Sequence, residues 1–195
     1  MIKINILLVG DTSVGKTSLC HRYAKNEYQD NYLSTIGVDY LDKVIDIDGK
    51  NVYLKIMDTS GQERYCAIVN NLFRQADGLI FVFDITKKDS FQAINRWITL
   101  AEDINDFPKI LVGNKIDLQN RRVIEKDKME DFAKKKNNIN CFETSAKTGE
   151  NVEDAFMHLI RLILTDKISK KSNKENKNVT LKENNEKNKA KNCCK

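Results

Sequence analysis

The sequence predicts an α/β fold with a six-stranded, mostly parallel sheet, one antiparallel edge strand and helices on both faces. Short apolar runs alternate with helical stretches along most of the chain, which is typical of a sheet covered on both faces. One two-residue hairpin signal, Asp48-Gly49, joins two strand patterns, and a glycine-bounded loop joins the first strand pattern to a helix.

The first three strands and one helix are expected in the N-terminal third of the chain. Residues 2–9 are nearly all apolar, as in a strand buried on both faces, and a helix begins at about Lys16. Residues 38–47 and 52–57 are the two strands that Asp48-Gly49 joins, so we expect them to pair antiparallel at the edge of the sheet.

The rest of the body alternates helices with buried strands. We expect strands at residues 78–83, 109–113 and 140–143, and helices at residues 91–103 and 125–135. A last helix with one apolar face follows Asn151, the expected N-cap, and ends near Asp166. One domain over residues 1–166 is therefore predicted.

Length and composition indicate one core and no membrane span. The chain has 195 residues, of which 41% are apolar, and no internal repeat. Its apolar stretches are far shorter than the roughly 20 residues that a membrane-spanning helix needs, and no cleavable signal pattern is present, so we expect a cytosolic body. The five scattered cysteines predict neither a disulfide framework nor a zinc site.

Charge separates this body from a tail at residues 167–195. The tail holds ten Lys and three Glu, a balance of +7, so the body carries −2 of the net charge of +5. It also holds seven Asn and few large apolar residues, too few to offset the entropy of ordering, and we predict disorder. The body has no basic patch interleaved with aromatic residues, so we expect no nucleic-acid partner.

A phosphate-binding motif lies between the first strand and the first helix. Residues 10–17 read GDTSVGKT, which fits GxxxxGK[ST] in the strand-loop-helix context that the mechanism requires. Loop N–H groups and the helix N-terminus can hold phosphates, Lys16 can neutralise the β and γ oxygens, and the Thr17 hydroxyl can ligate Mg²⁺. The predicted nucleotide-binding residues of this segment are Asp11, Thr12, Ser13, Val14, Gly15, Lys16, Thr17 and Ser18.

A second motif, DTSGQE at residues 58–63, follows the third strand. The spacing DxxG occurs often by chance, so its position at a strand end beside the phosphate loop carries the interpretation. There Asp58 can hold Mg²⁺ through water, the Gly61 N–H can reach the γ-phosphate, and Gln62 can orient the attacking water. We therefore predict Gln62 and Lys16 as catalytic residues.

A third motif identifies the base. NKID at residues 114–117 follows a strand, and the Asp117 carboxylate can accept from N1–H and the 2-amino group of guanine, whereas adenine has an acceptor at N1 and lacks that amino group. The stem of Lys115 can lie along the purine face. TSAK at residues 144–147 follows the next strand, where the Ala146 N–H can reach guanine O6. The predicted base-binding residues are Asn114, Lys115, Asp117, Ser145, Ala146 and Lys147.

These motifs together resemble those of Ras-superfamily small GTPases over about residues 3–166, which implies a P-loop NTPase fold of the Ras-like type. STIGVDY at residues 34–40, GLIFVFDIT at residues 78–86 and SF at residues 90–91 followed by Trp97 are similar to segments of Rab proteins. The resemblance implies Thr35 as a second Mg²⁺ ligand and Tyr28 as the aromatic side chain beside guanine.

Several positions depart from the usual Rab pattern. Met57 stands where Rab proteins usually have Trp, and LFRQ at residues 72–75 replaces YYRG, so the resemblance implies an effector triad of Tyr40, Met57 and Leu72. An ordinary Met at the edge of the core is the alternative for Met57. Ser60 and Thr12 also replace commoner residues, and we expect slow hydrolysis.

The resemblance implies a switch that binds GTP or GDP with Mg²⁺, hydrolyses GTP slowly and regulates intracellular vesicle traffic as a Rab-type monomer. The implied partners are a guanine-nucleotide exchange factor, a GTPase-activating protein, a GDP-dissociation inhibitor or escort protein, and effectors on the switch regions. Two alternatives stay open: a nucleotide-dependent binding module with negligible turnover, and a Ras-type signalling GTPase. Gln62 favours hydrolysis over the binding module.

Two adjacent cysteines, Cys193 and Cys194, lie in the lysine-rich tail. A CaaX box would need Cys at Asn192, so single prenylation is not expected. The ending resembles Rab tails, which implies geranylgeranyl groups on both cysteines and residence on the cytoplasmic face of intracellular membranes, with cycling through the cytosol. Two lipid chains give stable anchoring where one gives marginal binding.

Overall fold

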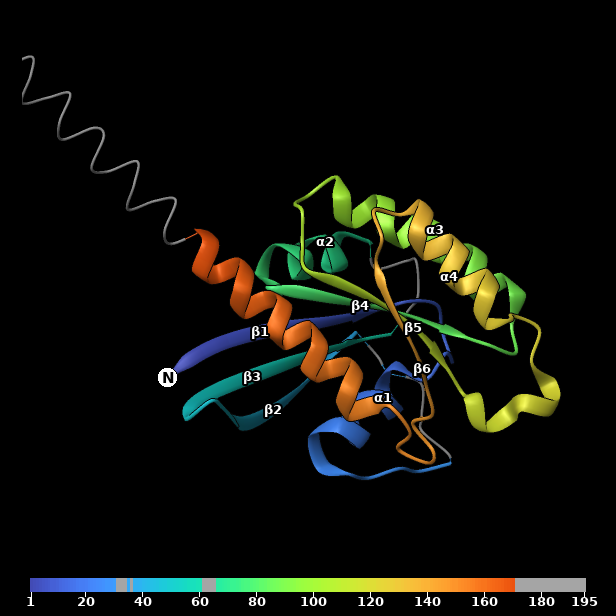
Figure 1. The fold of residues 1–195 in the computed structure, drawn as a ribbon, viewed down its shortest axis with the longest axis horizontal. Coiled ribbons are helices and arrows are strands. Elements are labelled where there is room, and N and C mark those ends of the chain that lie inside the picture. Colours follow the sequence, from blue (N-terminus) through green and yellow to red (C-terminus); the bar gives the residue numbers. More distant parts are fainter. Residues whose placement is uncertain (31–34, 36, 61–65, 171–195) are drawn as a thin grey trace, which may run out of the picture.

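A six-stranded sheet organises the chain (Figure 1). The computed structural model describes residues 1–30, 35, 37–60 and 66–170. The strands are β1 (Ile2–Val9), β2 (Val38–Ile47), β3 (Lys50–Thr59), β4 (Gly78–Asp84), β5 (Lys109–Asn114) and β6 (Asn140–Thr144). Their order is β2-β3-β1-β4-β5-β6, with β2 antiparallel to β3 and all other neighbours parallel. The predicted α/β fold with one antiparallel edge strand is confirmed.

Helices cover both faces of this sheet. They are α1 (Lys16–Lys25), α2 (Cys66–Gln75), α3 (Lys88–Glu102), the 3-10 helix η2 (Ile116–Arg121), α4 (Lys126–Lys135) and a C-terminal helix described over residues 152–170. Figure 1 shows α1 and the orange C-terminal helix on one face, and α2, α3 and α4 on the other. Within the described ranges, no helix is both long enough and apolar enough to cross a membrane.

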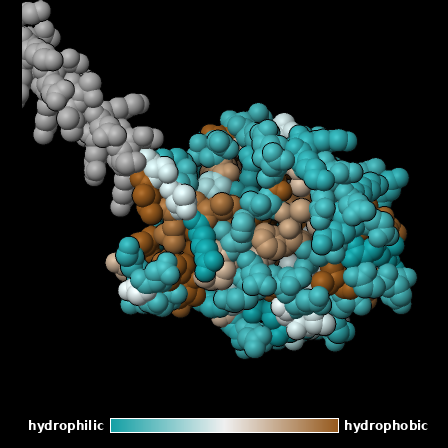
Figure 2. All heavy atoms as spheres, in the orientation of Figure 1, coloured by the Kyte–Doolittle hydropathy of each residue, from teal (hydrophilic) through white to brown (hydrophobic). Residues whose placement is uncertain are grey.

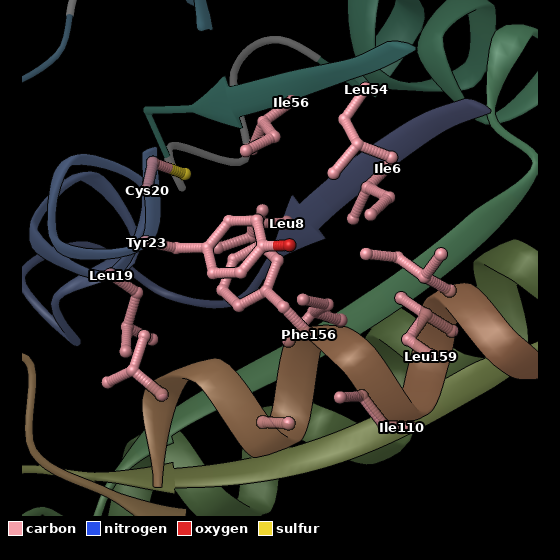
Figure 3. Close-up of a cluster of buried hydrophobic side chains, with 14 of the residues drawn as sticks. Ile6, Leu8, Leu19, Cys20, Tyr23, Leu54, Ile56, Ile110, Phe156 and Leu159 are labelled. Carbon is pink, nitrogen blue, oxygen red and sulfur yellow. The ribbon is translucent and has the colours of Figure 1, made fainter. Parts of the chain in front are cut away.

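The core has one apolar layer on each face of the sheet. Between α1 and the C-terminal helix, Tyr23 and Phe156 stack with ring centroids 4.0 Å apart, among the strand residues labelled in Figure 3. On the other face, Phe83 of β4 meets Phe91 of α3 edge-on at 4.8 Å, and Trp97 is 2% exposed. All seven residues of β4 are buried, as expected for a strand covered on both faces.

Pairing in the β2–β3 hairpin reaches the turn itself. Ile47 pairs with Lys50, and the two turn residues, Asp48 and Gly49, have φ angles of 52° and 75°. Such a two-residue turn with both φ angles positive matches the twist of the flanking strands. β3 therefore begins two residues before the predicted start at Val52.

The C-terminal helix continues beyond its predicted end near Asp166, through Lys170. Lys167 Nζ lies 2.8 Å from Oδ1 of Asp77 and donates to the Lys3 carbonyl at 2.9 Å, and Lys170 pairs with Asp166 at 2.7 Å. These contacts hold four residues that sequence composition assigns to the tail. Residues 171–195 lie outside the described ranges, so their disorder stays a prediction.

The start of this helix lies at its predicted position. Asn151 has a φ of 56°, and its side-chain amide donates to the carbonyl of Glu143 in β6 at 2.8 Å. Asn151 directly precedes the helix, and its carbonyl accepts from the Ala155 N–H at 3.1 Å, so it occupies the predicted N-cap position. Its side chain attaches the helix start to the end of β6.

The C-terminal ends of five strands lie at the same edge of the sheet, because these strands are parallel: β1, β3, β4, β5 and β6. The loops that follow them carry the predicted motifs. The opposite edge is different: Figure 2 shows a hydrophobic patch near the described end of the C-terminal helix. A groove there is lined by the apolar residues Ile2, Ile47, Val52, Leu164 and Ile168.

The Tyr23–Phe156 stack should contribute strongly to stability. We expect Phe156→Ala to lower the free energy of unfolding by about 3–5 kcal/mol, because the substitution leaves a cavity beneath the C-terminal helix. Urea unfolding measures the change. Ile168→Ala on the same helix is the control, since this side chain is 68% exposed. Equal losses in both variants would contradict the assigned packing.

Candidate nucleotide-binding site

A pocket of about 280 Å³ opens at the edge where the parallel strands end. Its lining residues come from the β1–α1 loop, the first turn of α1, the segment after α1, and the ends of β3 and β5: Thr12, Ser13, Gly15, Lys16, Thr17, Ser18, Tyr28, Gln29, Asp30, Thr35, Thr59, Ser60 and Lys115. Gln29, Asp30, Thr59 and Ser60 are additions to the predicted set. Thr59 and Ser60 lie within the DTSGQE motif but have no predicted role, and Gln29 and Asp30 lie outside every motif.

Two glycines allow the β1–α1 loop to fold tightly. A Cβ on Gly10 would lie 2.1 Å from the Val82 carbonyl oxygen, and one on Gly15 would lie 2.3 Å from Nδ2 of Asn114. Ser13 and Gly15 have φ angles of 61° and 96°, and residues of this kind can turn successive backbone N–H groups toward one concavity. The first turn of α1 lines the same pocket, so the positive end of its dipole is available to an anion.

Lys16 is buried in this loop with 4% of its surface exposed. Its Nζ donates to the carbonyl oxygens of Gly10 and Asp11, both at 2.8 Å. Burial lowers the pKa of Lys16 from 10.5 to about 8, while the carboxylates of Asp58 and Asp11 act in the opposite direction. A desolvated ammonium gains from a nearby anion, so this side chain is suited to phosphate oxygens.

Three side-chain oxygens converge next to Lys16. Thr17 Oγ1 donates to Asp58 Oδ2 at 2.5 Å, and Thr35 Oγ1 lies 2.8 Å from Thr17 Oγ1 and 3.3 Å from Asp58 Oδ2. Burial raises the pKa of Asp58, although the Thr17 hydrogen bond and the charge of Lys16 lower it. Among the described residues, the buried Asp58 Oδ1 has no hydrogen-bond partner. Oxygen ligands with a single carboxylate fit Mg²⁺, which takes its remaining ligands from water and phosphate.

Asn114 joins the base side of the site to the phosphate loop. Its side chain is 1% exposed, and Nδ2 donates to the Val14 carbonyl at 2.9 Å. Its Oδ1 accepts from Thr144 Oγ1 and from the Ala146 N–H, both at 3.2 Å. One amide therefore connects the loops after β1, β5 and β6.

Lys115 makes a second connection to the same loop. Its Nζ donates to the Ser13 carbonyl at 2.7 Å and lies 2.8 Å from Oδ2 of Asp84, which is 1% exposed. Burial alone would raise the pKa of Asp84, but hydrogen bonds from Lys115 and Thr86 hold it below its ordinary value. The ammonium is thereby fixed and the stem of Lys115 lines the pocket. Asp84 belongs to none of the predicted site motifs.

Asp117 receives its orientation from Ser145. The buried Ser145 hydroxyl donates to Asp117 Oδ1 at 2.6 Å and accepts from the Thr148 N–H at 3.1 Å. Asp117 itself is exposed. An acceptor for base N–H groups needs this combination of a fixed carboxylate and an open face.

Tyr28 lies in the segment after α1 and lines the pocket. Burial, followed by the charge and hydrogen bond of Asp30, raises the pKa of Tyr28. Asp30 in turn accepts from Lys147 Nζ at 3.3 Å. The segment with Tyr28 thus lies beside the loop that contains Lys147.

Asp11 directs its carboxylate to α3. Trp97 Nε1 donates to Asp11 Oδ1 at 3.2 Å, and Arg96 Nη2 lies 3.5 Å from the same oxygen. The carbonyl of Asp11 meanwhile accepts from Lys16. The apolar face of the helix that contains Trp97 is predictable from its sequence pattern. The contact with Asp11 is not, because the two residues are 86 positions apart.

The implied effector triad is only partly exposed. Tyr40 is 45% exposed, but Met57 and Leu72 are 1% and 3% exposed and belong to the core layer beneath α2 and α3. Met57 pairs with Tyr40 across β2–β3 and with Leu7 on its other side, which places it inside the sheet rather than at an edge. The structure corrects the triad in favour of a core role for Met57.

Four predicted functional residues lie outside the described ranges. They are Gly61, Gln62, Cys193 and Cys194. Their roles in γ-phosphate contact, water positioning and lipid attachment stay predictions.

Comparison with known proteins agrees with this geometry. The family model described as Ras family matches residues 5–165. The chain is 39% identical over 187 residues to the GTP-binding protein YPT1 of Saccharomyces cerevisiae, with 89% of each chain covered. It is 42% identical over 161 residues to Ras-related protein Rab-1C of Dictyostelium discoideum, covering 80% of this chain and 78% of the relative. It is 40% identical over 173 residues to Ras-related protein Rab-8B of Homo sapiens, covering 88% and 83%. The chain therefore belongs to the Ras family of small GTPases, within its Rab branch.

Proposed function

We propose that this chain is a GTP-hydrolysing switch that regulates intracellular vesicle traffic. The observation that carries the proposal is the meeting of three groups at one sheet edge: the buried ammonium of Lys16, the oxygen cluster around Asp58, and the Asp117 carboxylate held by Ser145. A nucleoside triphosphate with Mg²⁺ needs all three.

Phosphoryl transfer in this site depends mainly on positioning and charge. Lys16 and the α1 N-terminus supply positive charge at the β and γ oxygens, and Gln62 orients the attacking water for in-line displacement. Thr17 and Thr35, with Asp58 through water, would hold Mg²⁺, which when bound would supply charge neutralisation for the phosphates.

Base selection follows from the donors of guanine. The Asp117 carboxylate accepts from N1–H and the 2-amino group. The Ala146 N–H donates to O6 in a bifurcated bond that it shares with Asn114 Oδ1, its 3.2 Å acceptor in the structure. Adenine would leave the carboxylate without donors, a mismatch of the kind that gives discrimination of about 10⁴. The stem of Lys115 and the ring of Tyr28 line the pocket beside the base.

Two alternatives differ in what they predict. A binding module with negligible turnover would share the nucleotide site but release no phosphate. A Ras-type signalling role is less supported, because the relatives named above include two Rab proteins and YPT1.

Partners and membrane attachment complete the proposal. The expected partners would bind the segments around Thr35 and Gln62, with the exposed Tyr40 ring as one contact. They are exchange factors, activating proteins, an inhibitor or escort protein, and effectors. Geranylgeranyl groups on Cys193 and Cys194 would anchor the chain to the cytoplasmic face of membranes, assisted by the lysines of the tail.

Base recognition is tested by Asp117→Asn. The amide can donate to the carbonyl that replaces the 2-amino group in xanthosine triphosphate, so GTP affinity should fall by about two orders of magnitude or more while affinity for xanthosine triphosphate rises. Competition binding measures both. Asp127→Asn, at an exposed acidic residue in the first turn of α4, is the control. Wild-type selectivity for GTP in the Asp117 variant would refute its role.

The Mg²⁺ assignment is tested by Thr17→Asn. Loss of the hydroxyl should weaken GTP at least about tenfold more than GDP, because GTP carries more phosphate charge for a bound Mg²⁺ to offset. Thr17→Ser keeps the hydroxyl and serves as the control. Dissociation constants are measured with Mg²⁺ and with EDTA, and the excess loss for GTP should vanish in EDTA. A loss that is equal for both nucleotides in Mg²⁺ would count against the ligand set.

Hydrolysis is tested by Gln62→Leu. An apolar side chain cannot orient water, so single-turnover phosphate release should slow at least about tenfold while GTP binding stays near wild type. Gln92→Leu, at an exposed position of α3, controls for the substitution itself. If the wild type itself released no phosphate from GTP, the binding-module alternative would replace the hydrolase.

A further inference from the structure

Arg22, near the end of α1, contacts two segments that flank the base site. Its Nε donates to the Ala146 carbonyl at 2.9 Å, and its Nη2 donates to the Lys147 carbonyl at 2.8 Å. Its Nη1 donates to both the carbonyl and the side-chain oxygen of Asn26, each at 3.0 Å. One guanidinium therefore uses all three of its nitrogens on backbone or side-chain oxygens.

The first of these segments is the loop after β6. Its inner side faces the base-recognition groups, since Ser145 donates to Asp117 and the Ala146 N–H donates to Asn114. Arg22 reaches the outward carbonyls of the same loop, at two consecutive residues. Holding both carbonyls restricts rotation of the peptide between Ala146 and Lys147, next to the N–H assigned to guanine O6.

The second segment leads from α1 to Tyr28. Asn26 ends α1 in the left-handed conformation, with φ of 57°. Arg22 holds this residue two positions before Tyr28, and Asp30 beyond it pairs with Lys147 at 3.3 Å. One side chain therefore contacts both the segment that leads to Tyr28 and the loop after β6.

We propose that Arg22 is a positioning residue for guanine recognition, which sets the Ala146 N–H for O6 by holding the loop after β6 from outside. This inference rests on the proposed function, since it concerns how the same site binds its base. None of the nucleotide-binding motifs includes Arg22, and its contacts with the loop span 124 and 125 residues.

An arginine is required here for a geometric reason. The planar guanidinium presents donors in a fixed fork, so two carbonyls and Asn26 can be held at once, whereas a lysine ammonium is a point donor on a flexible stem. Arg22→Lys therefore keeps the charge and loses the fork.

The test compares GTP with 6-thio-GTP, in which sulfur replaces O6 and the N1–H and 2-amino donors remain. Sulfur is a poorer acceptor, so wild type should prefer GTP by about tenfold, the value of one hydrogen bond of about 1.4 kcal/mol. Arg22→Lys should weaken GTP by roughly tenfold but 6-thio-GTP by much less, because the contact that the loop supplies is already weak there. Its preference should fall to about twofold.

Two further variants keep the result interpretable. Arg161→Lys, at an exposed position of the C-terminal helix, controls for the same chemical change away from the site. Asn26→Gly keeps the left-handed backbone but removes one acceptor of Arg22, so its preference for GTP should lie between wild type and Arg22→Lys. Asn26→Gly also carries the test if Arg22→Lys does not fold.

The outcomes separate cleanly. A general loss of stability would weaken both nucleotides equally and leave the preference for GTP over 6-thio-GTP unchanged, which would overturn the positioning role. Wild-type affinities in both the Arg22 and Asn26 variants would also overturn it. If wild type bound ATP as tightly as GTP, the proposed function itself would fail, and that result does not depend on Arg22.

Discussion

The Asn114 side chain is the contact on which the arrangement of the site depends. Its amide nitrogen fixes the Val14 carbonyl of the phosphate loop, and its amide oxygen accepts from Thr144 and the Ala146 N–H. A buried amide can satisfy these partners only if the loops after β1, β5 and β6 lie in one arrangement. Gly15 takes part in the same constraint, because a side chain there would occupy the position of the Asn114 amide.

Burial of charged groups in the site costs free energy of folding, and a bound ligand of opposite charge can offset that cost. Lys16, Asp58 and Asp84 are each at most 4% exposed, and burial disfavours the charged form of each. Asp84 is compensated within the protein by Lys115 and Thr86. Among the described residues, Lys16 is compensated by two carbonyls and more distant carboxylates, and one oxygen of Asp58 has no partner. The groups with incomplete compensation are those assigned to phosphate and Mg²⁺, as expected where function opposes stability.

The sequence predicts the sheet well and the connections between loops poorly. Every predicted strand is present: β4 is apolar because it is covered on both faces, and the Asp48-Gly49 turn locates the partly exposed β2 and β3. Element ends are harder: the extension of the C-terminal helix depends on Lys167 reaching Asp77 and Lys3, which local pattern cannot show. The three nucleotide motifs locate the pocket because each contains the chemistry it needs within a few residues. Trp97 contacts Asp11 across 86 residues, and Arg22 contacts Ala146 and Lys147 across 124 and 125 residues. Asp84 pairs with Lys115 from a different strand. No local sequence pattern identifies these contacts.

Because Met57 and Leu72 are buried, Tyr40 is the exposed member of the implied effector triad. The Thr35 hydroxyl contacts both Thr17 and Asp58, and the Ser60 N–H donates to the Gly37 carbonyl at 3.1 Å, which ties the start of β2 to the end of β3. Tyr40 lies two residues into β2, opposite Met57, with Lys55 Nζ 4.2 Å from its ring centroid. We therefore expect a partner that contacts the exposed Tyr40 ring to bind within a few residues of Thr35, the proposed Mg²⁺ ligand. Met57, opposite Tyr40, lies in the same buried cluster as Leu7 and Leu72, so the strand that pairs with Tyr40 is packed against the core.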